Sequence, residues 1–287
     1  MKNGQSQAQW LTALINEFTL NSPENTLGLD TDEKAFDAPL VAFSSGADEL
    51  YIFYRHHIGS FYQAPLDFFK NHFPDISALA EDLTVISWII PSTSKTREEQ
   101  ASRKKYPSER WARTRLSGED FNISLRKHIV AELTKAGIPA LAPMLSHLWS
   151  RSDEGEYAPC SNWSERHAAY AAGLGTFGLC DGLITPVGKA VRVGSVIAKI
   201  NITPDKRPYN THQAYCLHFT DKGCQACIDR CPVNAISDKG HDKKRCMQYT
   251  EYTMNQYIKE QYGMDTYACG LCQAGVPCTS GIPEKDK

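Results

Sequence analysis

Apolar residues recur at every fourth position between residues 118 and 136, which is the spacing of an amphipathic helix. The residues that form this apolar stripe are Phe121, Leu125, Ile129 and Leu133. Gly137 ends the pattern, as glycine commonly does at the C-terminus of a helix. Other apolar patterns predict four further helical segments, at 8–20, 66–73, 76–82 and 164–172.

Runs of apolar and β-branched residues predict four strands, at 40–43, 50–54, 83–90 and 193–200. The run at 83–90 is expected to be a buried strand that ends at Pro91. Strands that alternate with helices in this way indicate an α/β or α+β fold. Proline-bearing turns at 204 and 208 mark a boundary, so we predict a larger domain over 1–205 and a smaller module over 206–287.

Composition indicates a soluble protein with a sizeable core. Of the 287 residues, 41% are hydrophobic, and the formal net charge of −2 gives no general attraction to nucleic acid or anionic lipid. The first ten residues are too polar for a signal peptide, and the apolar run at 83–90 is too short to span a bilayer. We therefore expect a cytoplasmic protein whose thiols are reduced.

Cysteine spacing carries the clearest chemistry. Eight of the ten cysteines lie between residues 216 and 278, and the core of this stretch is Cys224-x2-Cys227-x3-Cys231-Pro232. This pattern matches most of the bacterial ferredoxin run C-x2-C-x2-C-x3-C-P, in which the fourth cysteine serves a second cluster. Two cubane clusters need eight thiolates, so we predict two 4Fe–4S clusters. Structural zinc and disulfides are weaker alternatives, because zinc sites usually close with four ligands.

Ferredoxin spacing divides the eight thiols into two sets. The first set is Cys216, Cys224, Cys227 and Cys278. The second set is Cys231, Cys246, Cys269 and Cys272. Asp221 stands where the ferredoxin run has its first cysteine, and Cys216 is the better candidate for that role because thiolate is the softer ligand.

Glycine is unusually frequent just before the cysteine-rich stretch. The positions are Gly173, Gly175, Gly178, Gly182, Gly188 and Gly194. Such a density suggests a backbone that approaches something flat and large, although tight packing explains it equally well. The first three glycines also resemble a dinucleotide-binding loop, but they follow a predicted helix and not a strand, so that interpretation fails.

Together, the glycine-rich and cysteine-rich segments resemble the epoxyqueuosine reductase family and its relatives, the reductive dehalogenases. The resemblance covers about residues 150–280 well and the N-terminal half only loosely. It implies a nitroreductase-like α/β domain that carries cobalamin, and a ferredoxin-like module whose two clusters pass electrons to cobalt. The residues that it assigns to the cofactor pocket are Gly173, Leu174, Gly175, Gly178, Leu183, Ile184, Gly188 and Ser195.

This chain also departs from the family pattern. The family has an Asp-x-Ala-Pro motif whose aspartate donates a proton to the substrate, whereas this chain reads Glu156-Tyr157-Ala158-Pro159. Glu156 and Tyr157 are therefore the candidate proton donors, although Glu156 also fits an ordinary solvated charge in an acidic loop. The departures suggest a sibling group with another substrate. An epoxyqueuosine base in tRNA is therefore a doubtful substrate for this chain.

Several other residues have ordinary structural explanations. His167 is expected to be a hydrogen-bonded structural histidine, and Cys160 and Cys180 to be buried small side chains. Residues 95–115 carry eight basic and three acidic side chains together with Tyr106 and Trp111, which fits RNA binding but fits a solvated helix face better.

Two functions remain open from the sequence. One is a cobalamin-dependent reductase that receives electrons from a reduced donor such as ferredoxin or flavodoxin. The other is an iron–sulfur electron carrier or reductive activator without a corrinoid, in which the glycine-rich segment serves packing or docking.

Overall fold

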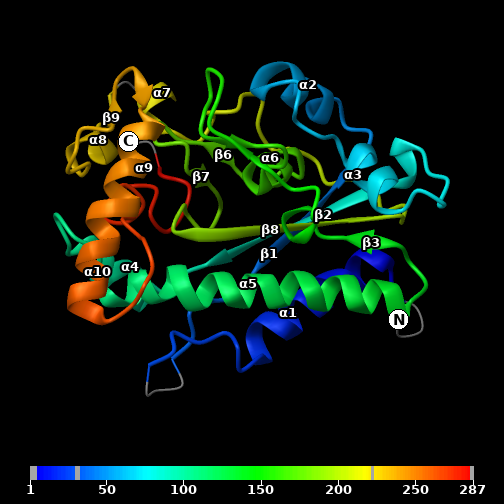
Figure 1. Cartoon of the computed structure of the whole chain (residues 1–287), viewed down its shortest axis with the longest axis horizontal. Coiled ribbons are helices and arrows are strands. Elements are labelled where there is room, and N and C mark those ends of the chain that lie inside the picture. The colour runs from blue at the N-terminus through cyan, green and yellow to red at the C-terminus, as the bar shows by residue number, and fades with distance from the viewer. Residues whose placement is uncertain (1–4, 30–32, 221–222, 285–287) are drawn as a thin grey trace.

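The computed structural model describes residues 5–29, 33–220 and 223–284 (Figure 1). Its centre is a four-stranded sheet in the order β1–β2–β8–β3, with every neighbouring pair antiparallel. The strands are β1 (Leu40–Ser45), β2 (Thr84–Pro91), β3 (Ala140–Leu141) and β8 (Val191–Ala198). Three of the predicted strands, at 40–43, 83–90 and 193–200, are thus confirmed.

Two helices cover one face of the sheet. Figure 1 shows α5 (Glu109–Lys135) lying along the sheet with α1 (Gln7–Asn21) beside it. The predicted stripe from Phe121 to Leu133 is buried in the core between α5 and the sheet, because its four-residue spacing keeps those side chains on one face of the helix. The helix begins nine residues earlier than predicted, since the Ser108 side chain caps it by accepting a hydrogen bond from the Trp111 N–H.

Three shorter helices cover the opposite face. They are α2 (Glu49–Ile58), α3 (Pro65–His72) and α6 (Glu165–Ala171). Neighbouring residues of β2 face the two cores in turn, with Val85 packed in the core beneath these helices and Ile86 in the core beneath α5. Burial on both faces explains why β2 is mostly apolar and does not alternate between apolar and polar residues.

The prediction of a strand at 50–54 is wrong, because these residues belong to helix α2. Asp48 caps the helix by accepting a hydrogen bond from the Leu50 N–H at 3.0 Å. Tyr51 and Tyr54 are buried one helical turn apart, whereas a strand would place them on opposite faces. The predicted helix at 76–82 is reduced to a single 3-10 turn, η1 (Ala80–Asp82).

The remaining elements are short. They are α4 (Ser94–Ala101), η2 (Pro143–Leu145), the pair β4 (Arg151–Ser152) and β5 (Cys160–Ser161), and the pair β6 (Thr176–Phe177) and β7 (Leu183–Ile184). The C-terminal elements are α7 (Leu217–Thr220), α8 (Ala226–Asp229), β9 (Ile236–Ser237), β10 (Gly240–His241), α9 (Lys243–Gln248), the π-helical turn η3 (Tyr249–Met254) and α10 (Asn255–Tyr262).

The mixed α/β architecture agrees with the predicted fold class. In Figure 1, α8, α9 and α10 gather at one end of the sheet, where the cysteine-rich segment lies. The division of the chain at residue 205 stays a prediction. Among the described residues, no helix is both long enough and apolar enough to span a membrane.

Candidate functional site

The first predicted set of thiols lines one small cavity. Cys216, Cys224, Cys227 and Cys278 surround a space of about 20 Å³, together with Leu179 and Ile184 from the glycine-rich segment. The four thiols come from the loop before α7, from the start of α8 and from the C-terminal loop, so the fold brings together positions far apart in the sequence.

The second predicted set lines a larger cavity of about 480 Å³. The thiols of this set are Cys231, Cys246, Cys269 and Cys272. The cavity continues away from them toward Glu165 and Arg126, on the sheet side of the molecule. The 480 Å³ cavity is therefore larger than the space that its four thiols enclose. Asp221, the alternative ligand, lies outside the described residues, and the assignment of individual ligands stays a prediction.

Cys180 and Lys189 lie between the two sets, and the sequence did not single out either residue for this position. Hydrogen bonds with the Cys227 and Cys272 thiols hold the pKa of the Cys180 thiol well below its usual range. The Lys189 Nζ atom donates a hydrogen bond to the Cys180 Sγ atom at 3.3 Å. Burial alone would lower the pKa of Lys189, but its interactions with Cys180 and the neighbouring cysteines outweigh burial and raise it.

The described residues form no site for a single metal ion. Within residues 5–29, 33–220 and 223–284, no three His, Cys, Asp or Glu side chains converge closely enough to hold one metal ion.

The predicted corrin-contacting glycines pack mainly against the chain itself. A Cβ atom on Gly175 would lie 2.3 Å from the Ile184 carbonyl oxygen, and one on Gly188 would lie 2.1 Å from the Thr279 carbonyl oxygen. Gly188 has a φ of +87°, which also favours glycine, as does Gly173 with the same value. Tight backbone packing therefore accounts for these three glycines. Gly178, in contrast, lines a cavity.

The other four predicted corrin contacts are dispersed. Leu174 and Leu183 share a hydrophobic cluster near α6, and Leu183 also reaches the 480 Å³ cavity. Ile184 lies beside the first set of thiols. Ser195 is buried, accepts a hydrogen bond from Trp163 Nε1 at 3.1 Å and donates one to Glu165.

A third cavity, of about 740 Å³, contains one of the two candidate proton donors. Tyr157 lines it, with its ring centroid 4.5 Å from that of His57. Cys160 and His167 line it as well, and burial lowers the pKa of His167 to about 3. Glu156 is exposed on the loop before Pro159 and is not among the residues that line this cavity.

The 740 Å³ and 480 Å³ cavities adjoin, because Arg166 and Tyr267 line both of them. The Arg166 guanidinium donates a hydrogen bond to the Asp181 carbonyl oxygen between them. Together the two cavities form a space that extends from the second set of thiols to Tyr157.

Glu165 was not identified from the sequence as a functional residue. Its side chain is only 11% exposed and lines the 480 Å³ cavity. Burial raises the pKa of Glu165 to about 7, although Arg126, which donates to its Oε1 atom at 3.2 Å, opposes this shift. No local pattern could have revealed it, since the burial depends on β8 packing against α6 and on Arg126 of α5 reaching the Glu165 carboxylate.

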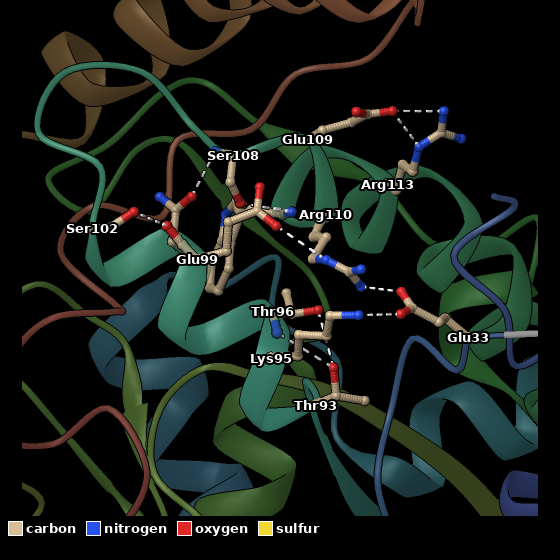
Figure 2. Close-up of polar contacts among 12 residues, drawn as sticks. Glu33, Thr93, Lys95, Thr96, Glu99, Ser102, Ser108, Glu109, Arg110 and Arg113 are labelled. Atoms are coloured by element: carbon tan, nitrogen blue, oxygen red, sulfur yellow. Dashed lines mark hydrogen bonds and ion pairs between the residues drawn. The ribbon is translucent and has the colours of Figure 1, made fainter. Parts of the chain in front are cut away.

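The basic segment 95–115 is largely engaged in contacts within the chain. Figure 2 shows Lys95 and Arg110 both directed at Glu33, and Arg110 also pairs with Glu99 at 3.0 Å. Arg113 pairs with Glu109 at 2.8 Å. These ion pairs favour the structural explanation of the segment over RNA binding.

Comparison with curated proteins identifies two groups of relatives. Over 171 residues the chain is 28% identical to an epoxyqueuosine reductase of Staphylococcus aureus (strain NCTC 8325 / PS 47), which is 58% of this chain and 40% of that protein. Over 130 residues it is 31% identical to a tetrachloroethene reductive dehalogenase of Dehalobacter restrictus (strain DSM 9455 / PER-K23), which is 44% of this chain and 22% of that protein. The chain thus spans less than half the length of these relatives. No protein-family model matches it.

Solved structures from the same two groups superpose on the chain. A selenomethionine-labelled epoxyqueuosine reductase covers 96% of this chain and 68% of its own, with a TM-score of 0.46 and 18% identity. A reductive dehalogenase described with a mechanism for B12-dependent dehalogenation covers 72% of this chain and 27% of its own, with a TM-score of 0.47 and 19% identity. By sequence, the chain is thus similar to epoxyqueuosine reductase and, over a shorter stretch, to the reductive dehalogenases.

Proposed function

We propose that this chain is a reductase that holds two 4Fe–4S clusters and delivers their electrons to a corrinoid and its substrate. The observation that carries the proposal is the division of eight thiols into two sets of four around two separate cavities. Four thiolates are the full ligand set of a cubane, and such clusters transfer single electrons. We also propose that residues 206–287 form the electron-transfer module and residues 1–205 the catalytic domain.

The second cluster is the one that faces the reaction site in this proposal. Its four cysteines line the cavity that extends to Glu165 and then adjoins the 740 Å³ cavity. The first set, around Cys227, faces no comparable space. Electrons would therefore enter near the first cluster and leave from the second. A reduced ferredoxin or flavodoxin is the donor class we propose.

The size of the cavities supports binding of a corrinoid, but the predicted glycine contacts do not. The two adjoining cavities offer a large concave site, which is the usual setting for a cofactor. The residues that would hold the group there are Arg166, Phe177, Gly178, Leu179, His212 and Tyr267. When bound, a corrinoid supplies a cobalt centre that can be reduced by one electron at a time.

Tyr157 is the better placed of the two candidate proton donors. It lines the 740 Å³ cavity beside His57, and burial raises the pKa of its phenol, so the phenol stays protonated at neutral pH. Glu156 lies on the exposed side of the same loop. In this proposal Tyr157 holds the proton that a reduced substrate takes up.

The substrate stays open between a small molecule and a base in tRNA. One relative is named for tetrachloroethene, a small molecule, and a solved epoxyqueuosine reductase is described with an epoxyqueuosine-modified tRNA stem loop. The ion pairs that occupy the basic segment 95–115 favour a small molecule. We propose the cytoplasm as the compartment, because unpaired cysteine thiols persist in a reducing environment.

One observation favours the second candidate function, an iron–sulfur electron carrier without a corrinoid. Gly173, Gly175 and Gly188 are explained by backbone packing, so they no longer require a flat cofactor.

The visible spectrum of anaerobically purified protein, before and after cobalamin is added, separates the two functions. A bound corrinoid adds absorption bands to the broad iron–sulfur spectrum and supports the reductase. Protein with about eight iron and eight sulfide per chain but no cobalamin affinity supports the carrier. About four iron per chain, or stoichiometric zinc, contradicts both.

A further inference from the structure

A buried cationic side chain separates the two sets of cluster thiols. Lys189 is only 3% exposed, and it is the residue that lines both the 480 Å³ cavity of the second set and the 20 Å³ cavity of the first set together with thiols of each. Its ammonium group is close enough to interact with Cys227 and Cys278 of the first set and with Cys272 of the second. The positive charge of Lys189 therefore acts on both ligand sets.

Two contacts fix Lys189 in this position. Its backbone N–H donates to the Cys278 carbonyl oxygen at 3.0 Å. Its Nζ atom donates to Cys180 Sγ at 3.3 Å, and Cys180 itself contacts Cys227 and Cys272. Cys180 is thus a ninth sulfur at the centre of the site, in addition to the eight that two clusters need.

We propose that Lys189 raises the reduction potentials of both 4Fe–4S clusters and that Cys180 holds its ammonium group between them without binding iron. A cluster with four thiolate ligands is anionic, and it becomes more negative when it accepts an electron. A buried cation stabilises the reduced form more than the oxidised form, and burial leaves that interaction poorly screened. Net charge and hydrogen bonds to sulfur are the features by which proteins set these potentials.

The inference rests on the proposed two-cluster content, and the wild-type protein tests that content first. Iron and sulfide analysis together with electron paramagnetic resonance of the reduced protein establishes whether two clusters are present. If they are absent, the proposed function fails before any variant is made. If they are present, the variants test Lys189 alone.

The decisive experiment is a potentiometric titration of Lys189→Met, followed by electron paramagnetic resonance. Methionine matches lysine in length but has no charge. We expect both clusters to be retained, and the ratio of reduced to oxidised cluster at a fixed potential to fall at least tenfold for each. This fall corresponds to about 59 mV for a one-electron couple. Unchanged potentials in Lys189→Met overturn the proposal.

Matched variants separate charge from structure. Lys189→Arg keeps the charge and should stay close to wild type. Lys244→Met removes an exposed lysine two residues from Cys246 and should cause a much smaller shift, because solvent screens that charge. If Lys189→Met does not assemble clusters, Lys189→Gln carries the same expectation. Failure of both neutral variants alongside assembly in Lys189→Arg overturns the proposal in favour of a role in assembly.

Cys180→Ala tests the part assigned to the ninth sulfur. Both clusters should remain, with unchanged iron content, because Cys180 is not a ligand in this proposal. Loss of iron, or conversion of one cluster to a three-iron form, means that Cys180 binds iron and overturns its assigned role.

Discussion

The backbone N–H of Lys189 and the carbonyl oxygen of Cys278 are hydrogen-bonded at 3.0 Å, which joins the glycine-rich segment to the C-terminal loop of the protein. Gly188, the preceding residue, lies directly against Thr279 and Ser280 in that loop. The glycine-rich segment therefore supports the position of a predicted cluster ligand. Its glycines are needed for this contact whether or not a cofactor lies nearby.

Gly188→Ala should displace the C-terminal loop and weaken binding of the cluster that includes Cys278. The new Cβ atom would lie 2.1 Å from the Thr279 carbonyl oxygen, too close for any packed structure. Iron analysis and electron paramagnetic resonance should show partial or complete loss of one cluster. Gly137→Ala is the matched control, because Gly137 also has a positive φ, of +75°, but has no atom within 4 Å of the new Cβ. Equal iron loss in both variants would point to backbone strain and not to the contact with Thr279.

Cys216→Ala should convert or remove one cluster and leave the other intact. Cys216 is buried and lines the same small cavity as Cys224, Cys227 and Cys278, so it supplies the fourth thiol of that set. Asp221→Ala should leave both clusters unchanged, because carboxylate is the harder and less favoured ligand. Iron content and the spectrum of the reduced protein measure both variants. The opposite pattern would show that Asp221 binds the cluster.

The sequence predicted those parts of the molecule that depend on local periodicity or on fixed spacing. The stripe Phe121–Leu133 and the apolar run 83–90 are buried as expected, because helix and strand periods determine which side chains share a face. The eight thiols that the cysteine spacing singled out line two cavities, and their assignment to clusters stays a prediction. The prediction of a strand at 50–54 failed because a short apolar segment fits both a helix and a strand period. Only the packing of Tyr51 and Tyr54 identifies the segment as a helix.

Features that depend on contacts between distant segments could not be predicted. Lys189 and Cys180 are an ordinary lysine and an ordinary cysteine until the fold places them among thiols from the C-terminal segment. The glycines were ambiguous for a related reason, since a glycine needed against backbone and one needed against a cofactor look alike in a sequence. Gly175 is resolved only by its distance from the Ile184 carbonyl oxygen.

Leu125→Ala should destabilise the protein by about 2–5 kcal/mol, the usual cost of removing a large aliphatic side chain from a packed core. Leu125 is fully buried between α5 and the sheet. Leu116→Ala is the control on the same helix, because Leu116 is 38% exposed and should change stability by no more than about 0.5 kcal/mol. Anaerobic thermal unfolding followed by circular dichroism compares the two. Equal effects would contradict the orientation of α5.

Glu165 should make stability depend on pH between about 4.5 and 7. Burial raises its folded pKa to about 7, above the unfolded value of 4.5, so the folded protein binds the proton more tightly. Its contribution to stability is therefore complete below pH 4.5 and is lost as the pH rises through 7. The loss is on the order of 3 kcal/mol. Glu165→Gln cannot titrate, so the melting temperature of wild type relative to this variant should fall from pH 5 to pH 8. A constant difference would mean that Arg126 keeps Glu165 ionised.

Gly175 and Gly178 should respond differently to alanine, and the difference tests whether the 740 Å³ cavity binds a cofactor. A Cβ atom on Gly175 would lie 2.3 Å from the backbone of β7, so Gly175→Ala should lower the melting temperature whatever the cavity holds. On Gly178 the nearest atom is the Cδ1 end of Ile184, at 3.2 Å, which can move aside.

Gly178→Ala should therefore keep the stability and both clusters of the wild-type protein. Because Gly178 lines the cavity, the added methyl group should nevertheless weaken cobalamin binding, measured by anaerobic spectroscopic titration. Ala158→Gly makes a change of similar size in the reverse direction at a buried residue that does not line the cavity, and it should leave the affinity unchanged. If Gly178→Ala binds cobalamin as tightly as wild type, the corrinoid lies elsewhere in the protein. The Tyr157 cavity would then be a site for substrate alone.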